Sequence, residues 1–342
     1  KKKHHRGSSE DDECPSRPFL EKELKDIITR NMPPEEAKKN RKELLAFITE
    51  GVQRIWGAEA QCKVFGSVGM GIDTRTSDLD IVILVGEEHT RTGNAYHARV
   101  ALSMVHKWLK KECWTEFISA ARVPIIKCHH MGVDCDISYG ITGGYEAAGR
   151  IRALCEKHEQ LSNVIRIVKL WVKTLPLPKS DNRGLSSYGW ILLVSFFFEY
   201  DLPRKEKGIC DIFLEMLIYY TEDFDRKRFG ISLRNGHPIQ KHKLQCYRTS
   251  NRMTKPMALC IEDPLDPFND VAGALYSETH EKIIECMIVA KQDLEDILDM
   301  PPDRRRGCLS ERGEDLLLEV FAEYAPELSR NKKEEDRLKS QS

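Results

Sequence analysis

Hydrophobic residues recur at intervals of three and four near the start of the chain and predict two helices. Between residues 18 and 56 this spacing is kept by Leu20, Leu24, Ile27, Ile28, Leu44, Leu45, Ile48, Val52 and Ile55. Such residues share one face of a helix and bury it against the rest of a domain. Met32-Pro33-Pro34 interrupts the pattern. Because proline inside a helix breaks it, we expect one helix on each side of this tripeptide.

The pattern changes between residues 62 and 139, where short apolar runs are separated by turns. It predicts a strand, a turn, a second strand, a helix over residues 97–111 and two further strands. From residue 149 to 290 helical spacing returns, with elements expected at 151–174, 188–199, 211–223 and 280–296. The sequence therefore predicts an α+β fold, with a mixed-sheet domain at 45–148 and a mainly helical domain formed by 18–44 and 149–329. The polar, charged ends, 1–17 and 330–342, are expected to be disordered.

Two acidic residues stand at the start of the second predicted strand. Residues Leu79–Val85 form a continuous apolar run. Alternate side chains of a strand point the same way, so Asp78 and Asp80 share a face. Two adjacent carboxylates repel each other and resist desolvation, which calls for a bound cation. Oxygen ligands with open coordination positions suit Mg2+, with Mn2+ as the alternative.

A second acidic pair, Asp134 and Asp136, lies on another strand-like segment. A neighbouring strand can bring one of these acids beside the first pair. Three carboxylates that hold two Mg2+ ions about 3.5 to 4 Å apart form the usual clamp for in-line phosphoryl transfer. The Gly66-Ser67 turn can then hold triphosphate oxygens through backbone N–H groups and the serine hydroxyl. Each motif alone is commonly a surface feature or a plain turn, but their combination favours the catalytic interpretation.

Later motifs follow in an order that resembles the RNA-specific terminal nucleotidyltransferases of the DNA polymerase β-like superfamily. They are Ala121-Arg122-Val123-Pro124-Ile125-Ile126-Lys127, Leu185-Ser186-Ser187-Tyr188-Gly189, Cys260-Ile261-Glu262-Asp263-Pro264-Leu265 and Asn269-Asp270-Val271. This family includes the terminal uridylyltransferases and related poly(A) polymerases, and the resemblance runs from Leu44 to Ala290. It implies a polymerase-β-like palm, a helical second domain, a nucleotide cleft between them, and two Mg2+ or Mn2+ ions.

The resemblance also implies roles for individual residues. Asp78 and Asp80 bind both ions, whereas Asp136 completes the site of the ion that activates the RNA 3'-hydroxyl and accepts its proton. The residues that hold the triphosphate are Gly66, Ser67, Lys169, Lys173 and Ser187. By the family pattern, Tyr188 stacks on the nucleotide base, and Asp263 and Asp266 recognise that base through hydrogen bonds.

The same residues of the helical domain could equally serve local structure. Lys169 and Lys173 are four apart on an amphipathic helix, where two exposed lysines are ordinary and an anion between them relieves their repulsion. Ser187 stands before a very apolar run, as a helix N-cap does. Asp263 followed by Pro264 has the pattern of an N-cap and a first helical residue.

The choice of nucleotide stays open between UTP and ATP. An acid such as Asp263 accepts a hydrogen bond from uracil N3-H or from the adenine amine, so it does not separate the two. An acid at Asp266 is typical of the uridylyltransferases, whereas the pattern from Pro264 to Val271, with Asn269, is closer to nuclear poly(A) polymerases. The acid pair and the compact build favour UTP and resemble the small mitochondrial uridylyltransferases of kinetoplastids. That resemblance implies an RNA 3' end as substrate, a mitochondrial location rather than a nuclear or cytoplasmic one, and a larger RNA-processing complex.

Composition limits the remaining classes. A chain of 342 residues, 41% of them hydrophobic, can form two domains with separate cores. The formal net charge of −1 argues against a broadly basic nucleic-acid coat, so RNA contacts must come from local patches such as 38–42, for which a solvated face is the alternative. The longest apolar stretch, 190–198, is too short to cross a bilayer, so we expect no membrane association. A small-molecule nucleotidyltransferase and an inactive RNA-binding scaffold fit the motifs less well.

Overall fold

The computed structural model describes residues 17–86, 95–121, 123–178, 182–200, 207–249 and 259–299. The tails predicted at 1–17 and 330–342 therefore lie outside the described residues, apart from Arg17. The chain divides into two compact units, each described by itself below. The sheet unit contains residues 29–166 and 263–267, and the helical unit contains the residues up to 28, 167–262 and those from 268 onward.

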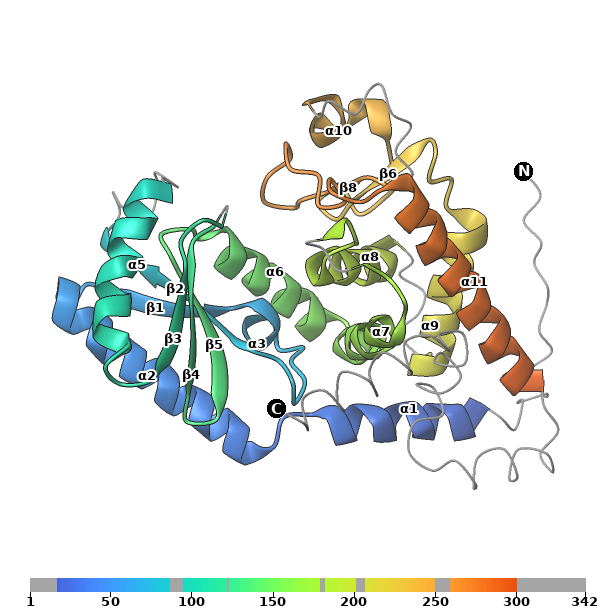
Figure 1. Cartoon of the computed structure of the whole chain (residues 1–342). Coiled ribbons are helices and arrows are strands. Elements are labelled where there is room, and N and C mark those ends of the chain that lie inside the picture. Colours follow the sequence, from blue (N-terminus) through green and yellow to red (C-terminus); the bar gives the residue numbers. More distant parts are fainter. Residues whose placement is uncertain are drawn as a thin grey trace, which may run out of the picture. The chain divides into compact units, whose positions relative to one another are not determined.

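The sheet unit is built on five strands in the order β1-β2-β5-β4-β3 (Figure 1). The strands are β1 (Gln61–Phe65), β2 (Leu79–Leu84), β3 (Trp114–Ile118), β4 (Ile125–His130) and β5 (Val133–Tyr139). Strands β2 and β5 run parallel, and the other neighbours are antiparallel. Three strands follow the helix of this unit rather than the two predicted. The missed strand is β3, an edge strand whose exposed residues give it no strong apolar pattern.

Helices cover one face of this sheet. They are α2 (Glu35–Trp56) and α5 (Ala95–Leu109), while α3 (Gly66–Met70) follows β1 and α6 (Gly143–Lys157) follows β5. The core between sheet and helices contains Leu44, Ile48, Ile81, Ile83, Leu102, Val105, Cys135 and Ile137. Along β2 and β5 the apolar residues alternate with Asp80, Asp134 and Asp136. Burial of the apolar face therefore leaves these acids on the opposite face of the sheet.

Two predicted helix boundaries can be compared with the structure. The break at Met32-Pro33-Pro34 is confirmed, because α1 (Arg17–Asn31) ends just before it and α2 begins just after it. The single element predicted at 151–174 is wrong. The structure has two helices there, α6 and α7 (Leu161–Thr174), because the chain turns to an extended conformation at His158.

The helical unit packs around α8 (Ser187–Tyr200), in which all residues from Gly189 to Phe198 are buried. A helix that is apolar on every side has to be surrounded by protein. Trp171 of α7 meets Trp190 of α8 at 5.9 Å between ring centroids and Phe213 of the neighbouring helix at 5.7 Å, both edge to face. No described helix combines the length and the apolar character needed to cross a bilayer.

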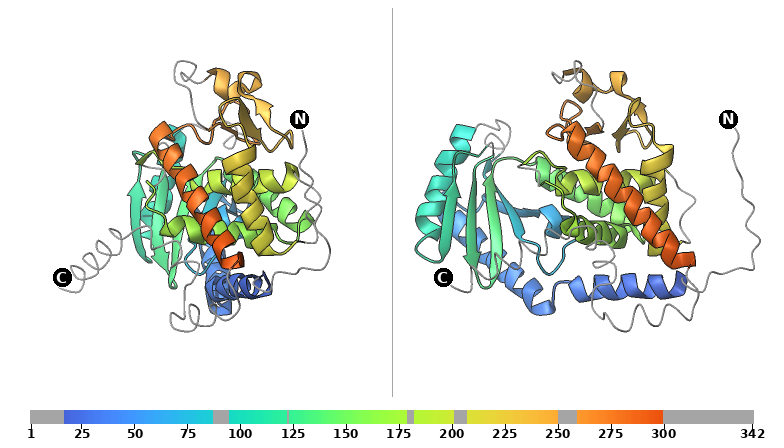
Figure 2. Two further views of the ribbon diagram at one scale, coloured as in Figure 1. Left: turned by 90° about the vertical axis from the view of Figure 1, so that its right-hand side faces the viewer. Right: turned by 45° about the vertical axis from the view of Figure 1, so that its right-hand side comes forward.

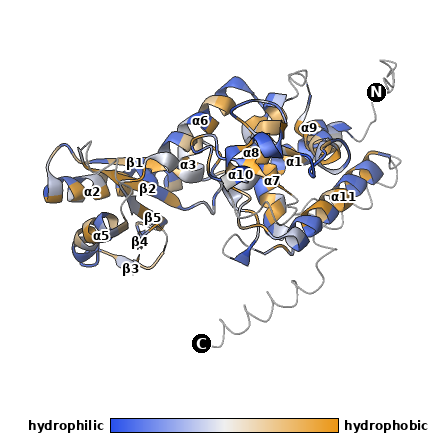
Figure 3. Cartoon of the chain, turned by 90° about the horizontal axis from the view of Figure 1, so that it is seen from above, coloured by the Kyte–Doolittle hydropathy of each residue, from blue (hydrophilic) through white to orange (hydrophobic). Residues whose placement is uncertain are grey.

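The remaining elements of this unit are α9 (Ile209–Ile218), the π-helix η3 (Tyr219–Asp223), β6 (Phe229–Ser232), β7 (Ile239–Gln240), η4 (Lys241–Lys243), α10 (Gln245–Thr249), β8 (Ile261–Glu262) and α11 (Ser277–Asp299). Helix α11 lies beside α9 (Figure 2) and is fastened to η3 by the ion pair of Lys291 with Glu222, at 2.6 Å. Hydrophobic and hydrophilic residues alternate along α11 (Figure 3), as expected of a helix with one buried face. The α+β class is confirmed, although a small sheet of order β7-β6-β8 joins the helices here.

Candidate active site

Two of the predicted catalytic acids are direct neighbours in the sheet. Asp80 of β2 and Asp136 of β5 are register partners in the parallel pair, so their side chains leave the same face from backbones about 4.8 Å apart. Both are partly exposed, and Asp78, which directly precedes β2, is exposed. This face is the one that α2 and α5 leave uncovered, so a ligand can reach the carboxylates.

A lysine accompanies this acid pair. Lys127 on β4 is the register partner of Asp136 on the other side, and its Nζ lies 3.6 Å from Asp136 Oδ1. It balances part of the negative charge at the site. Beneath the pair, the buried Cys135 thiol is kept neutral, because its hydrogen bond with Cys128, its burial and the nearby carboxylates raise its pKa.

The carboxylates fit a divalent ion by chemistry and by position. Within the described part of the chain, no three His, Cys, Asp or Glu side chains are already gathered around one point that could hold a metal ion. Asp80 and Asp136 nevertheless emerge side by side, and oxygen donors of this kind suit Mg2+ or Mn2+. A bound ion would compete with Lys127, whose Nζ lies 3.6 Å from Asp136 Oδ1, for this carboxylate.

Gly66 fits closely against Asp80. Its φ is +59°, and a Cβ added there would lie 1.8 Å from Asp80 Oδ2. The left-handed backbone and the missing side chain together demand glycine at this position. The Gly66-Ser67 turn thus starts α3 against the Asp80 carboxylate, where backbone N–H groups at a helix start attract anions.

Two buried arginines hold the loop that leads into Asp78. Arg41 of α2 donates to Asp73 Oδ2 and to the Ser77 carbonyl, both at 2.6 Å. Arg166 of α7 donates to the Gly71 carbonyl at 2.6 Å and to the Asp73 carbonyl at 3.2 Å. Both arginines are 7% exposed. The loop's backbone is therefore anchored on two sides just before the acids.

These arginines were not found by sequence reasoning. Arg41 belongs to the basic run at 38–42 that was considered for RNA, but it turns inward, and Lys38 and Lys39 pair with Glu35 and Glu43 of their own helix. The charge run is therefore mostly a helix surface with one buried anchor. Nothing within residues 38–42 distinguishes Arg41 from its basic neighbours. Its burial depends on Asp73, which lies 32 residues further along the chain.

The predicted phosphate ligands of the helical unit lie on α7 and α8. Lys169 is half-buried and Lys173 exposed, four residues apart on α7. The N-cap of α8 is Ser186, whose Oγ accepts the Gly189 N–H at 3.1 Å. Ser187 is instead the first helical residue and is exposed. The expectation that Ser187 caps the helix is wrong, because Ser186 occupies that position.

Tyr188 and the two predicted base-reading acids lie elsewhere in the chain. Tyr188 follows Ser187 on α8, with its hydroxyl buried. Asp263 Oδ1 accepts the Leu265 N–H at 3.0 Å, and Asp266 is exposed. No helix starts at Asp263, so the predicted N-cap is wrong. A second proline at 267 disfavours helix at residue 266 and keeps the segment a bend.

Two further acids, to which the sequence alone assigned no role, anchor the loop that carries Asp263 and Asp266 at its two ends. Glu262 is 3% exposed, accepts a hydrogen bond from Ser232 and pairs with Arg234 at 3.5 Å. Asp270 Oδ1 accepts the backbone N–H groups of Ile261 and Ala272, each at 3.0 Å. Local side-chain bonds of this kind fix a loop without helix or sheet.

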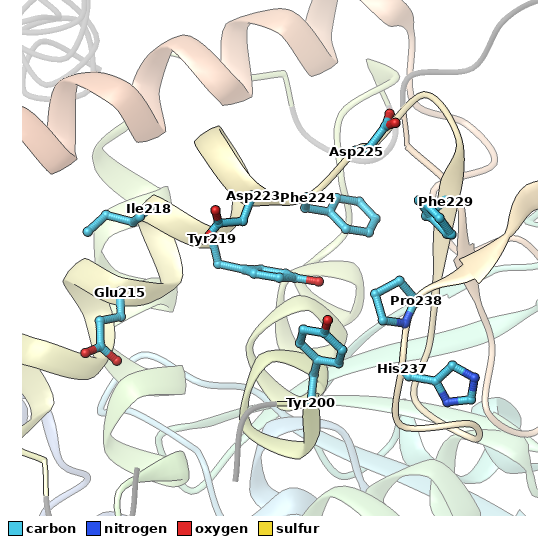
Figure 4. Close-up of a pocket in the computed structure, with 10 residues that line it drawn as sticks. All are labelled: Tyr200, Glu215, Ile218, Tyr219, Asp223, Phe224, Asp225, Phe229, His237 and Pro238. Carbon is cyan, nitrogen blue, oxygen red and sulfur yellow. The ribbon is translucent and has the colours of Figure 1, made fainter. Parts of the chain in front are cut away.

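The helical unit also holds a pocket of 670 Å3 that contains none of the predicted site residues. Aromatic rings from Tyr200, Tyr219, Phe224 and Phe229 line it, together with Glu215, Ile218, Asp223, Asp225, His237 and Pro238 (Figure 4). The rings of Tyr200 and Tyr219 lie close together in the pocket, with centroids 5.5 Å apart. Its acidic residues make it unsuited to a triphosphate.

Comparisons with known proteins agree with this architecture. A family model described as "Poly(A) RNA polymerase, mitochondrial-like, central palm domain" matches residues 20–154, and one described as "Cid1 family poly A polymerase" matches residues 208–269. The chain contains a poly(A) polymerase-like palm domain and a Cid1-family domain. The family resemblance inferred from the motifs is thereby confirmed.

The chain is also similar to individual proteins that are named poly(A) RNA polymerases. Poly(A) RNA polymerase protein 2 of Saccharomyces cerevisiae is 28% identical over 272 residues, 76% of this chain and 45% of that protein. Poly(A) RNA polymerase cid14 of Schizosaccharomyces pombe is 30% identical over 255 residues, 72% of this chain and 36% of that protein. The matched part thus spans less than half of either relative.

A crystal structure of the Cid1 poly(U) polymerase superimposes on the chain with a TM-score of 0.72. It is 16% identical, and the match covers 85% of this chain and 98% of that one. At this identity the likeness concerns the fold alone, and it is consistent with the polymerase-β-like class predicted from the motifs.

The arginine anchors lead to a stability prediction. Arg41→Ala leaves Asp73 without its buried partner, so we expect a loss of about 3 to 5 kcal/mol in the free energy of unfolding. Arg54→Ala is the matched control on the same helix, because Arg54 makes an exposed pair with Glu50 at 3.6 Å and should cost less than about 1 kcal/mol. Urea denaturation measures both variants. Equal losses in the free energy of unfolding of the two variants would show that the buried Arg41 pair stabilises the fold no more than an exposed ion pair does.

Proposed function

We propose that this chain is a template-independent RNA 3'-terminal nucleotidyltransferase that adds UMP from UTP by two-metal-ion phosphoryl transfer. The observation that carries the proposal is the register of Asp80 with Asp136, with the Gly66-Ser67 turn closed against the same carboxylate. Paired oxygen ligands beside an anion-binding turn are what transfer of a phosphoryl group between oxygens requires.

In this mechanism Asp78, Asp80 and Asp136 would hold two Mg2+ or Mn2+ ions. Ions bound there would supply positive charge that neutralises the phosphate oxygens and favours in-line transfer. Asp136, at the edge of the acid pair nearer β4, orients the RNA 3'-hydroxyl and accepts its proton. Backbone N–H groups at Gly66 and the Ser67 hydroxyl hold phosphate oxygens of the nucleotide.

The proposed ligands on the helical unit complete nucleotide binding. Lys169 and Lys173 supply positive charge for the triphosphate. The Ser187 hydroxyl is available for phosphate because the neighbouring Ser186 makes the cap. Tyr188 contributes a ring for the base, and stacking of this kind is worth about 1 to 3 kcal/mol without selecting the base.

The nucleotide assignment has a close rival. The acid pair favours UTP, because Asp263 and Asp266 are hydrogen-bond acceptors and Asp266 is exposed. ATP is the second candidate, because both curated relatives are named poly(A) RNA polymerases and because the chain has Asn269 in the poly(A)-like pattern. An RNA 3' end as partner, a larger RNA-processing complex and a mitochondrial location stay predictions.

A primer-extension assay tests the proposal. The full chain is incubated with a labelled single-stranded RNA, Mg2+ and each of the four nucleotides in turn. We expect extension with UTP above ATP, and both above CTP and GTP. More extension with ATP would transfer the assignment to poly(A) synthesis, and no extension with any nucleotide would refute terminal transfer.

The acid assignment has its own control within the same assay. Asp136→Ala should abolish extension, because the nucleophile loses its ion and its proton acceptor. Asp134→Ala removes the neighbouring acid of the same strand face and should leave the chemical step intact. Retained activity in Asp136→Ala would contradict the site.

The close approach of Gly66 to Asp80 yields a further prediction. Gly66→Ala pushes a methyl group into the Asp80 carboxylate, so we expect at least a hundredfold loss of extension activity. Gly71→Ala is the matched control, because its φ of +73° carries a similar backbone strain with nothing within 4 Å of the added Cβ. It should cost about 1 to 2 kcal/mol of stability with little effect on activity. Similar activities in the two variants would rule out a role for the close approach.

A further inference from the structure

The face that carries the acid pair is not symmetric. On the β1 side, α6 contacts β1, and a Cβ at Gly144 of α6 would lie 2.9 Å from the Phe65 ring. Phe65 is the register partner of Asp80, so α6 covers the acid face at this end. On the other side the face continues over β4 to the edge strand β3. Of its residues there, Trp114, Glu116 and His129 are exposed and Lys127 is partly exposed.

The exposed residues beyond Asp136 form two rows in register. One row runs from Asp80 through Asp136 and Lys127 to Glu116. The adjacent row runs from Asp134 through His129 to Trp114. Because neighbouring strands lie about 4.8 Å apart, Trp114 is about 10 Å from β5 across the sheet.

Trp114 is 60% exposed, unlike the other tryptophans of the chain. Trp171 and Trp190 are buried, and Trp56 and Trp108 are partly buried in their cores. An indole this exposed, on the edge strand at the end of a polar face, contributes little to the buried core and offers a flat surface for stacking. Beside it, His129 is oriented by a hydrogen bond of 2.7 Å between its Nδ1 and Asp134 Oδ1. Asp134 thus contacts His129, whereas Asp136 contacts Lys127.

We propose that Trp114, with His129 and Lys127, forms a platform for the last nucleotides of a single-stranded RNA whose 3' end reaches Asp136. A base stacks on the Trp114 ring, and His129 and Lys127 face the sugar-phosphate backbone. This inference rests on the proposed function and adds to it the path of the RNA substrate.

The direction of the reaction supports this path. In-line transfer needs the attacking 3'-hydroxyl and the leaving diphosphate on opposite sides of the transferred phosphorus. The Gly66-Ser67 turn, which suits the triphosphate, lies on the β1 side of the acid pair. The RNA must then approach from the opposite side, and there β4 and β3 present the exposed Trp114 ring, the His129 imidazole and the Lys127 ammonium group. Glu116 and Asp134 also lie on this side, which favours a stacked base over a dense phosphate track.

Kinetics with an RNA primer test the platform. At saturating nucleotide, Trp114→Ala should raise the KM for primer about 5- to 150-fold, the equivalent of one stacked base. The kcat and the KM for nucleotide should not change, because the variant leaves the acids and the turn in place. Trp114→Phe keeps a ring and should restore most of the affinity. Tyr96→Ala is the control, since Tyr96 is 67% exposed on α5, the helix that packs on the opposite face.

Binding measured without catalysis separates this inference from the proposed function. Single-stranded RNA should quench the tryptophan fluorescence of the wild-type chain and of Tyr96→Ala, and quench Trp114→Phe much less. An inactive wild-type chain that still shows this quenching would refute terminal transfer and keep the platform. An active chain whose primer KM is the same in Trp114→Ala, or whose fluorescence does not respond to RNA, would overturn the platform.

Discussion

The parallel pairing of β2 with β5 is the constraint on which the site depends. It sets Asp80 directly beside Asp136, and two carboxylates on adjacent backbones repel each other unless positive charge lies between or beside them. Lys127 supplies part of that charge in the structure. The rest of the sheet unit keeps the two carboxylates side by side despite their repulsion. The apolar core on the opposite face of the sheet fixes the register of the strands, and Arg41 and Arg166 fix the loop that enters β2.

The same alternation that buries one face of the sheet places the polar and acidic side chains together on the other face. A shift of one residue in register would turn the acids into the core and the isoleucines outward. Packing of the hydrophobic core therefore also keeps the acid pair on the exposed face. Along the exposed face, the Gly66 turn, the acid pair and Trp114 follow one another across the strands. In the proposed reaction this order corresponds to leaving group, transferred phosphorus and nucleophile, and this correspondence is the reason for proposing that nucleotide and RNA bind on opposite sides of the acid pair.

Local patterns in the sequence were sufficient for much of this. The period of two in β2 and β5 predicted that the acids share a face, and the helical spacing predicted α1 and α2 with the break at Met32-Pro33-Pro34. What failed depended on contacts between distant residues. Strand β3 exists because β4 pairs with it, Arg41 is buried because Asp73 lies opposite, and the bend at Asp263 is stabilised by its own side chain rather than by a helix. The N-cap of α8 was also wrong by one residue, because Ser186 and Ser187 are adjacent and only the hydrogen bond from Gly189 N–H to Ser186 Oγ distinguishes them.

The central claim is that Asp80 and Asp136 share divalent ions, and a crystal of the chain soaked in MnCl2 with a non-hydrolysable nucleoside triphosphate tests it most directly. Anomalous scattering identifies manganese independently of the protein density. The account predicts anomalous peaks coordinated by the carboxylates of Asp78, Asp80 and Asp136, with Lys127 released from Asp136. Well-ordered carboxylates with the nucleotide bound and no anomalous peak between them would contradict it.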